Sequence, residues 1–309
     1  MHAICALYKF TRLDDFETIQ LPLKGFLDSL SVKGTLLLAR EGINGTISGN
    51  QASLEKVLEY LQSDSRFLGL EYKFSYSKKT PFKRLKVKLK KEIVTMGLTE
   101  IDPTYSVGTY VKPKDWNKLI NDPDVVLIDT RNNYEYEIGS FKGAVNPKTE
   151  TFREFPSFTK NSLEKYRNKK IAMFCTGGIR CEKASAHLLK NGFEKVYHLK
   201  GGILNYLRKI KPDDSMWEGE CFVFDHRVSV IHGLREGKCE VCFGCRWPLQ
   251  KEDMASSEYE PGVCCPRCAE DLAPKRRAGL EERHRQVMLA RFQEKKHIGQ
   301  TIEEKSNTS

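Results

Sequence analysis

The stretch IAMFCTGGIRCEKASAHLL, Ile171–Leu189, indicates both the fold and the chemistry of this chain. A short apolar strand ends at Cys175, and a helical pattern follows it. Cys175 is therefore expected at the carboxyl end of a parallel strand, where open α/β sheets bind their ligands, facing the N-terminus of the next helix. Successive backbone N–H groups at Gly177 and Gly178, the helix dipole and Arg180 would stabilise a thiolate or a bound anion. We predict a reactive cysteine with a lowered pKa; the alternative is a buried cysteine that packs as a small hydrophobe.

The residues around this loop alternate between strand and helix patterns. Their order is typical of a parallel sheet with covering helices, an α/β domain. Asp129 and Arg131 follow the first of these strands and are predicted to support the site. The predicted strands are 125–129, 171–174 and 196–199, and the predicted helices are 163–168 and 182–191.

The first part of the chain has a different order of elements. It reads as strand, helix, two strands, helix and further strands, which is typical of a ferredoxin-like α+β unit. Asn44 and Gly45 supply the turn of a hairpin. The predicted strands are 3–10, 34–39, 46–48, 70–76 and 85–89, and the helices are 14–30 and 52–61. We predict a domain over 1–95, a linker over 96–121, an α/β domain over 122–217 and a Cys-rich segment with a basic helix (275–297) and a loose tail over 218–309.

The loop C-x4-R resembles the active-site loop of the rhodanese superfamily. VLIDTR (126–131), GSFKGAVNP (139–147) and LKGGILNY (199–206) resemble other rhodanese segments, with Ser140 and Phe141 as departures. The resemblance implies a rhodanese domain in which Thr176, Gly177, Gly178 and Ile179 form the loop between Cys175 and Arg180. The loop is shorter than that of the related phosphatases, which favours sulfur or thiol chemistry. Cys181 either resolves a persulfide or disulfide on Cys175 or simply occupies the first helical turn.

Together with AREGINGTISG (39–49) upstream and a cysteine cluster downstream, the rhodanese features resemble the bacterial oxygen-dependent tRNA uridine hydroxylase family. That family pairs an acylphosphatase-like N-terminal domain with a rhodanese domain. The resemblance implies that the chain converts the wobble uridine of tRNA to 5-hydroxyuridine, with dioxygen as co-substrate, an unidentified reductant and Cys175 as the essential residue. Two alternatives stay open: a sulfurtransferase that carries a persulfide on Cys175, and a non-catalytic RNA-binding adaptor.

The charge of the chain favours a polyanionic partner. The formal net charge is +10, and the pI is near 9.0. Between Lys78 and Lys91 there are eight basic residues and no acidic one, which suits a phosphate backbone, although lysines on an edge strand also prevent aggregation. We predict tRNA binding by the residues Lys83, Arg84, Lys86, Lys88, Lys90 and Arg40.

Seven of the ten cysteines lie between Cys221 and Cys268. Two CxxC pairs, Cys239 with Cys242 and Cys265 with Cys268, predict a structural zinc site, with Cys245 and Cys264 as possible further ligands. Reduced cysteines in a packed domain, disulfides formed on isolation or an iron–sulfur cluster are the alternatives. The chain shows neither a secretory signal nor a run of about 20 apolar residues, so we expect a cytoplasmic protein.

Overall fold

A computed structural model describes residues 1–293. The chain divides into two compact units, Met1–Gly237 and a second unit that begins at Lys238. The end of the predicted basic helix and the predicted loose tail lie outside the described residues. No described helix is long and apolar enough to cross a membrane.

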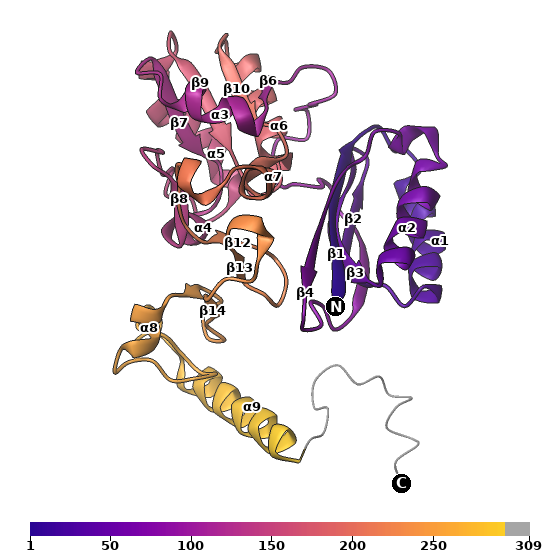
Figure 1. The fold of residues 1–309 in the computed structure, drawn as a ribbon, viewed down its shortest axis with the longest axis vertical. Coiled ribbons are helices and arrows are strands. Elements are labelled where there is room, and N and C mark those ends of the chain that lie inside the picture. Colours follow the sequence, from indigo (N-terminus) through magenta and orange to yellow (C-terminus); the bar gives the residue numbers. More distant parts are fainter. Residues whose placement is uncertain (294–309) are drawn as a thin grey trace. The chain divides into compact units, whose positions relative to one another are not determined.

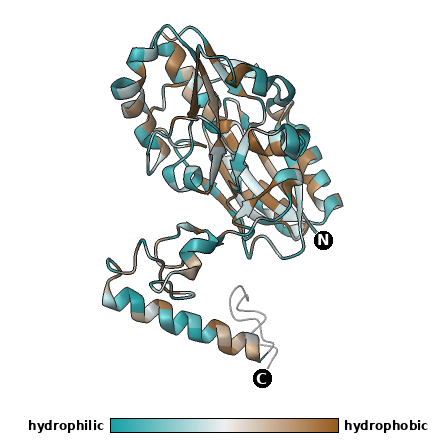
Figure 2. Cartoon of the chain, turned by 60° about the vertical axis from the view of Figure 1, so that its left-hand side comes forward, coloured by the Kyte–Doolittle hydropathy of each residue, from teal (hydrophilic) through white to brown (hydrophobic). Residues whose placement is uncertain are grey.

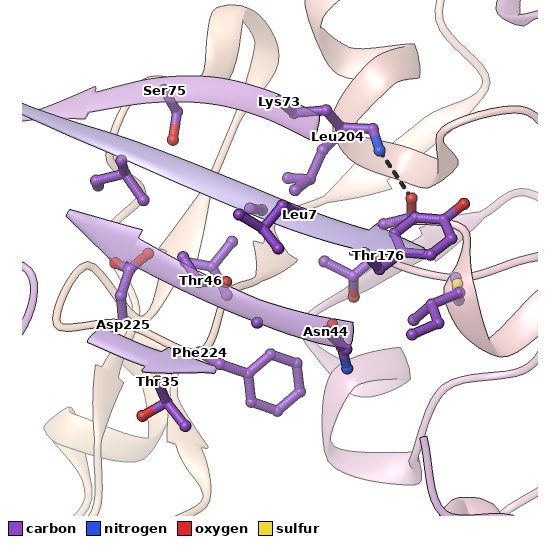
Figure 3. A pocket seen from close by; sticks show the side chains of 18 of the residues that line it. Leu7, Thr35, Asn44, Thr46, Lys73, Ser75, Thr176, Leu204, Phe224 and Asp225 are labelled. Atoms are coloured by element: carbon purple, nitrogen blue, oxygen red, sulfur yellow. Dashed lines mark hydrogen bonds between the residues drawn. The ribbon is translucent and has the colours of Figure 1, made fainter. Parts of the chain in front are cut away.

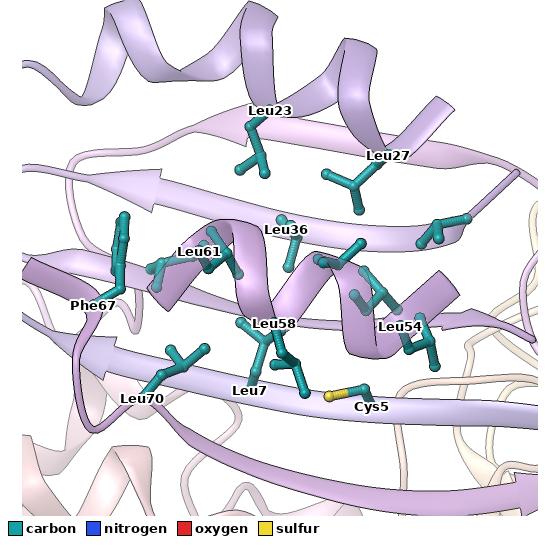
Figure 4. Packing of buried hydrophobic residues seen from close by; sticks show 14 of the residues in the cluster. Cys5, Leu7, Leu23, Leu27, Leu36, Leu54, Leu58, Leu61, Phe67 and Leu70 are labelled. Carbon is teal, nitrogen blue, oxygen red and sulfur yellow. The ribbon is translucent and has the colours of Figure 1, made fainter. Parts of the chain in front are cut away.

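The first unit begins with a five-stranded sheet in the order β4-β1-β3-β2-β5. The β2–β5 pair is parallel and the other pairs are antiparallel. Helices α1 and α2 cover one face of this sheet (Figure 1). Their leucines pack on Cys5, Leu7 and Leu36, residues that alternate along the strands with residues of the opposite face (Figure 4). The elements are β1 (His2–Phe10), α1 (Phe16–Ser29), β2 (Lys33–Ala39), β3 (Gly42–Gly49), α2 (Gln51–Gln62), β4 (Glu71–Ser77) and β5 (Leu85–Leu89).

The second sheet of this unit is entirely parallel and has the order β6-β10-β9-β7. Apolar side chains of α5 and α6 pack on one face of it, and those of α3 and α7 pack on the other. The elements are β6 (Thr109–Val111), α3 (Pro113–Ile120), β7 (Val125–Asp129), α4 (Asn133–Glu137), β8 (Gly139–Phe141), α5 (Phe155–Phe158), β9 (Lys170–Phe174), α6 (Ile179–Lys190), β10 (Val196–Leu199) and α7 (Gly202–Lys209).

Several boundaries differ from those predicted. Strand β6 and helix α3 fall inside the segment 96–121, which was predicted to be a linker, and Met96 and Ile101 are buried in the core of the second domain. Helix α6 begins at Ile179 rather than at Glu182. In place of the predicted helix 163–168, a π turn over Thr159–Leu163 is followed by a 3-10 turn over Glu164–Tyr166.

The first unit also extends past the predicted end of the second domain. Strand β11 (Trp217–Gly219) pairs with β8, and β12 (Cys221–Phe222) pairs with β13 (Ser229–Val230). His226 donates its backbone N–H to the carbonyl of Pro81 in the N-terminal domain. The segment up to Gly237 therefore belongs to the first unit.

The second unit contains a small hairpin and a long helix. Its elements are β14 (Glu240–Val241), β15 (Pro248–Leu249), α8 (Lys251–Ala255) and α9 (Pro274–Phe292). Helix α9 is hydrophilic over most of its length and more apolar toward its C-terminal end (Figure 2). The expected fold classes, an acylphosphatase-like domain, a rhodanese-like parallel sheet and a Cys-rich segment with a helix, are all confirmed.

Candidate active site

Cys175 directly follows the central strand β9 and precedes the N-terminus of α6. Gly178 has φ of +112°, a conformation that residues with a Cβ rarely adopt, and its N–H donates to Cys175 Sγ at 3.1 Å. At the other end of the loop, Ile203 N–H donates to the Cys175 carbonyl and Leu204 N–H donates to the Thr176 carbonyl. The loop is thus held by the N-termini of both α6 and α7, with the sulfur turned toward the donors of α6.

The surroundings of Cys175 favour its thiolate. Burial by itself raises the pKa of Cys175, but hydrogen bonds from the Cys181 thiol and the N–H groups of Cys181 and Gly178, together with the charge of Arg180, lower it to about 5. Burial and the neighbouring thiolate raise the pKa of Cys181 well above its ordinary value. The pair therefore consists of a Cys175 thiolate and a protonated Cys181 that donates to it.

Arg180 is held by a carboxylate that the sequence did not reveal. Its guanidinium makes a two-pronged ion pair with Glu135, at 2.5 and 2.8 Å, and also donates to Thr176 Oγ1 at 3.2 Å. Thr176 in turn donates to Glu135 at 3.1 Å. Glu135 is fully buried, and the Arg180 charge keeps the pKa of this carboxyl low in spite of its burial. The only available signal was that a buried arginine needs an acidic partner, and the sequence did not indicate which of the many acidic residues it is.

Asp129 and Arg131 form a second buried ion pair, with an N–O distance of 2.6 Å. Arg131 also donates to the Gly139 carbonyl at 2.6 Å, and its guanidinium lies 5.1 Å from the Trp217 ring. Ser140, where rhodaneses usually have histidine, donates its hydroxyl to Asp129 at 2.9 Å. These contacts connect the end of β7 to β8 and β11, so this pair supports the sheet edge beneath the loop.

The N-terminal domain contributes directly to the site. Tyr8 of β1 donates its hydroxyl to Glu182 of α6 at 2.7 Å, and Lys73 of β4 donates to the Gly177 carbonyl at 2.9 Å (Figure 3). Neither Tyr8 nor Lys73 was predicted as a site residue. Both lie on the sheet face that α1 and α2 leave uncovered.

The EGINGT segment joins the two domains. Glu41 forms an ion pair with the fully buried Lys183 of α6 at 2.6 Å, and Glu92 forms a second at 2.7 Å. Asn44 donates to the Ile93 carbonyl at 2.8 Å. Arg40, by contrast, is exposed and pairs with Asp14 at 2.7 Å. The EGINGT segment therefore acts at the contact between the two domains, and Arg40 does not take part in that contact.

A pocket of about 520 Å³ lies between the uncovered sheet face and the Cys175 loop. Its lining combines apolar side chains with the polar groups of Asn44, Thr46, Ser75 and Thr176. Phe224 is 60% exposed and contributes to the pocket from the segment after β12 (Figure 3). A mostly apolar cavity with a few polar groups, next to a cysteine whose pKa is lowered, is the usual form of a small-ligand site.

The predicted RNA-binding residues Lys83, Arg84, Lys86, Lys88 and Lys90 are all exposed. In the parallel register of β2 and β5, Lys86 is aligned with Thr35 and Lys88 with Leu37. Thr35 and Leu37 line the pocket, and aligned residues of neighbouring strands share a face. Lys86 and Lys88 therefore extend the pocket face of the sheet with positive charge at its edge.

Four thiols of the second unit converge, namely those of Cys242, Cys245, Cys265 and Cys268, which lie within 4.8 Å of one another. The Sγ atoms of Cys242 and Cys268 are 3.7 Å apart, as are those of Cys245 and Cys265. A tetrahedron with Zn–S bonds of about 2.3 Å has edges of about 3.8 Å, so the group can hold a metal ion such as zinc. Cys239, a predicted ligand, lies outside this group, whereas Cys245, a predicted further ligand, belongs to it; Cys264 also lies outside the four. The CxxC pair of Cys242 and Cys245 was the missed signal, because the 19 residues between it and Cys265 fit a zinc ribbon better.

Comparisons with known proteins identify both domains of the first unit. Residues 2–93 match the model of the UPF0176 acylphosphatase-like domain, and residues 112–209 match the model of the rhodanese-like domain. The chain therefore combines these two domains, the architecture expected of the tRNA uridine hydroxylase family. A rhodanese-like domain indicates a catalytic protein of the rhodanese kind.

Among solved structures, the chain is similar to a rhodanese-like domain from Anabaena sp., with 22% identity over 36% of this chain and 78% of that one and a TM-score of 0.29. It is also similar to a rhodanese-related protein from Thermoplasma volcanium, with 22% identity, coverage of 34% and 95%, and a TM-score of 0.28. A third, a protein of unknown function and possible tyrosine phosphatase from Rhodopseudomonas palustris, has 26% identity, coverage of 34% and 82%, and a TM-score of 0.29.

Proposed function

We propose that this chain is a tRNA-modifying enzyme that uses dioxygen to hydroxylate the wobble uridine at C5, with Cys175 as the nucleophile. The observation that supports this most is the position of the Cys175 thiolate, at the wall of a pocket whose opposite side is a sheet face edged by Lys86 and Lys88. This arrangement joins a reactive thiolate to a surface suited to a phosphate backbone.

The chemistry follows from the character of the thiolate. Addition of Cys175 Sγ to C6 of uracil forms a C–S bond and moves an electron pair toward C5 and the O4 carbonyl. The electron-rich C5 then takes one oxygen atom from dioxygen. A two-electron reductant of the thiol class removes the second oxygen atom as water, and two thiols become one disulfide. Loss of the C5 proton breaks the C6–S bond and releases the thiolate.

The pocket suits an unstacked base. An enzyme that acts on a base must remove it from its stack, and aromatic side chains commonly hold such bases. The exposed ring of Phe224 and the amide of Asn44 line the pocket together with the Cys175 loop. A uracil base fits comfortably in about 520 Å³.

The proposal is tested in cells that lack this protein and are complemented with wild type or with Cys175→Ala. Digested tRNA is analysed by mass spectrometry for 5-hydroxyuridine and its derivatives. We expect wild type but not Cys175→Ala to restore the nucleoside under aeration. Cys5→Ala, at a buried cysteine on the helix-covered side of the N-terminal sheet, is the matched control and should restore it. Unchanged nucleosides with wild type would overturn the proposal.

A sulfurtransferase that carries a persulfide on Cys175 is the second candidate. The rhodanese-like domain and the loop donors that stabilise an anionic sulfur support it. The two activities are distinguished by the adduct found on Cys175 of the purified protein. Thiosulfate would leave a sulfane-sulfur adduct on Cys175, whereas tRNA trapped during turnover would carry a covalent link to Cys175. A sulfane adduct combined with unmodified tRNA would favour the second candidate.

A further inference from the structure

Lys73 is a buried lysine on the uncovered face of the N-terminal sheet, in its edge strand. It lies on β4, and its residue is only 7% exposed. Lysine is rarely buried to this extent without a partner for its charge. Its ammonium donates to the Gly177 carbonyl at 2.9 Å, so the side chain crosses from one domain to the active-site loop of the other (Figure 3).

The path of this side chain is matched by the opposite domain. Gly201 has φ of +74°, and a Cβ at this position would lie 3.0 Å from Lys73 Cε. The first glycine of the GG pair in LKGGILNY thus leaves room for the lysine. Lys73 Nζ also lies 5.6 Å from the centre of the Tyr8 ring, within the range of a cation–π contact. Gly177 and Gly201 of the rhodanese-like domain and Tyr8 of β1 therefore surround the end of the Lys73 side chain.

The charged groups around Lys73 include three anionic or acidic ones. Burial lowers the pKa of Lys73, and the charges of Glu71, Cys175 and Glu182 oppose that shift, while Arg208 of α7 adds to it. Tyr8, whose own pKa is raised by burial and by Glu182, faces the same space from β1. A lysine in this position and the Cys175 thiolate stabilise each other's charged forms.

We propose that Lys73 is a positioning residue of the Cys175 site, supplied by the N-terminal domain. It holds the loop through the Gly177 carbonyl, and its charge stabilises the anionic sulfur in addition to the charge of Arg180. The rhodanese-like domain alone then has an incomplete site, which gives the fusion of the two domains a chemical reason. The inference requires that Cys175 is the reacting group, but it does not depend on whether the substrate is tRNA.

The test measures the thiolate of Cys175 directly. The full chain is alkylated with iodoacetamide between pH 4 and 8, and the rate at Cys175 is followed by mass spectrometry of its peptide. Lys73→Gln removes the charge but retains an N–H donor for the Gly177 carbonyl, and Lys73→Met removes both. Lys56→Met, at an exposed lysine of α2 on the far side of the same sheet, is the control.

We expect the inflection of the Cys175 rate to move to higher pH in both Lys73 variants, with a loss of about three- to tenfold in the rate at pH 5.5. Lys73→Gln should keep the wild-type melting temperature more closely than Lys73→Met, which separates the charge from the anchoring contact. A wild-type pH profile in a folded Lys73→Gln, or an equal shift in Lys56→Met, would overturn the inference. Since no RNA is present, failure of the proposed hydroxylation would leave this result intact.

Discussion

At the scale of single residues, the neighbours of the site residues change the protonation of ordinary side chains. Cys175 and Cys181 carry the same thiol group. The N–H groups at the start of α6 and the charge of Arg180 lower the pKa of Cys175, whereas burial and Cys175 raise the pKa of Cys181, which donates a hydrogen bond to Cys175. Glu135 neutralises Arg180 with two short contacts and so keeps the guanidinium beside the loop. In each of these pairs, the protonation or the position of one residue therefore depends on the other residue.

The hydrogen bond from Cys181 gives a prediction on the pH dependence. Cys181→Ala removes a donor to the thiolate, which destabilises the charged form and raises the pKa of Cys175 from about 5. The rate of Cys175 alkylation should then begin to rise at higher pH than in wild type. Cys181→Ser, which keeps a donor, should restore much of the wild-type profile.

This comparison also separates the two roles of Cys181. If Cys181 acts by resolving a disulfide, Cys181→Ser should lose turnover although its thiolate profile is close to that of wild type. Equal profiles for Cys181→Ala and wild type would contradict the hydrogen-bond role.

At the scale of elements, the first turn of α6 distributes four functions over four consecutive residues. Arg180 contacts Glu135, Cys181 contacts Cys175, Glu182 accepts from Tyr8, and Lys183 pairs with Glu41 and Glu92. Successive helical residues point about 100° apart, so one turn reaches the loop, the second-domain core and the N-terminal domain at once. This geometry explains why four consecutive residues, Arg180 to Lys183, can each contact a different part of the first unit.

The start of α7 gives the second prediction. A Cβ on Gly202, which has φ of +64°, would lie 2.4 Å from the Cys175 carbonyl oxygen and 2.7 Å from that of Thr176. Gly202→Ala should displace the loop and lower the melting temperature. It should also reduce the proposed tRNA hydroxylation, which depends on Cys175, by at least tenfold. Gly143→Ala, at a positive φ with nothing close to its Cβ, should show only the backbone cost of about 1 to 2 kcal/mol.

The cysteine knuckles of the second unit give the third prediction. Cys245→Ser should abolish stoichiometric zinc binding, and Cys239→Ser should retain it, because only Cys245 belongs to the converging thiols. Elemental analysis of the purified variants decides this. Zinc lost from Cys239→Ser and kept by Cys245→Ser would contradict the assignment.

At the scale of the whole molecule, the first unit is built around the contact between its two domains. Lys183 is fully buried, and both of its carboxylate partners, Glu41 and Glu92, come from the N-terminal domain. Tyr8 and Lys73 add further contacts to α6 and the loop. The pocket exists because these contacts hold the uncovered sheet face against the Cys175 loop.

The contact itself gives the fourth prediction. Lys183→Met leaves Glu41 and Glu92 without their buried cation and should lower the free energy of unfolding by about 3 to 5 kcal/mol. Lys190→Met, at an exposed lysine of the same helix that lies 3.9 Å from Glu100, should change it by less than about 0.5 kcal/mol. Denaturant titration measures the free energy of unfolding of both variants. Equal changes would show that the buried ion pairs of Lys183 do not stabilise the fold.

Local patterns in the sequence determined the two fold classes and placed Cys175 at the end of a parallel strand. Strand alternation and the glycine loop after β9 depend on residues close together in the chain, so each can be read without the fold. The predicted turn at Asn44–Gly45 is wrong: both residues lie inside β3, paired with Leu37 and Leu36 of β2, and the hairpin turns at Arg40 and Glu41. The acylphosphatase-like and rhodanese-like domains were therefore expected and are present. The predicted boundaries were less accurate, because β6 and α3 are short and are stabilised by the sheet and core that they join.

The tertiary structure alone decided which distant residues complete the site. Arg180 and Glu135 are 45 residues apart, Lys73 and Gly177 are 104 apart, and Lys183 and Glu41 are 142 apart. The chain offers 41 acidic residues as partners for a buried cation, and no local pattern selects among them. In the second unit, two overlapping CxxC choices were possible, and the packing of the knuckles selected Cys245. Long-range pairing of charges and thiols depends on three-dimensional proximity, which only the folded chain defines.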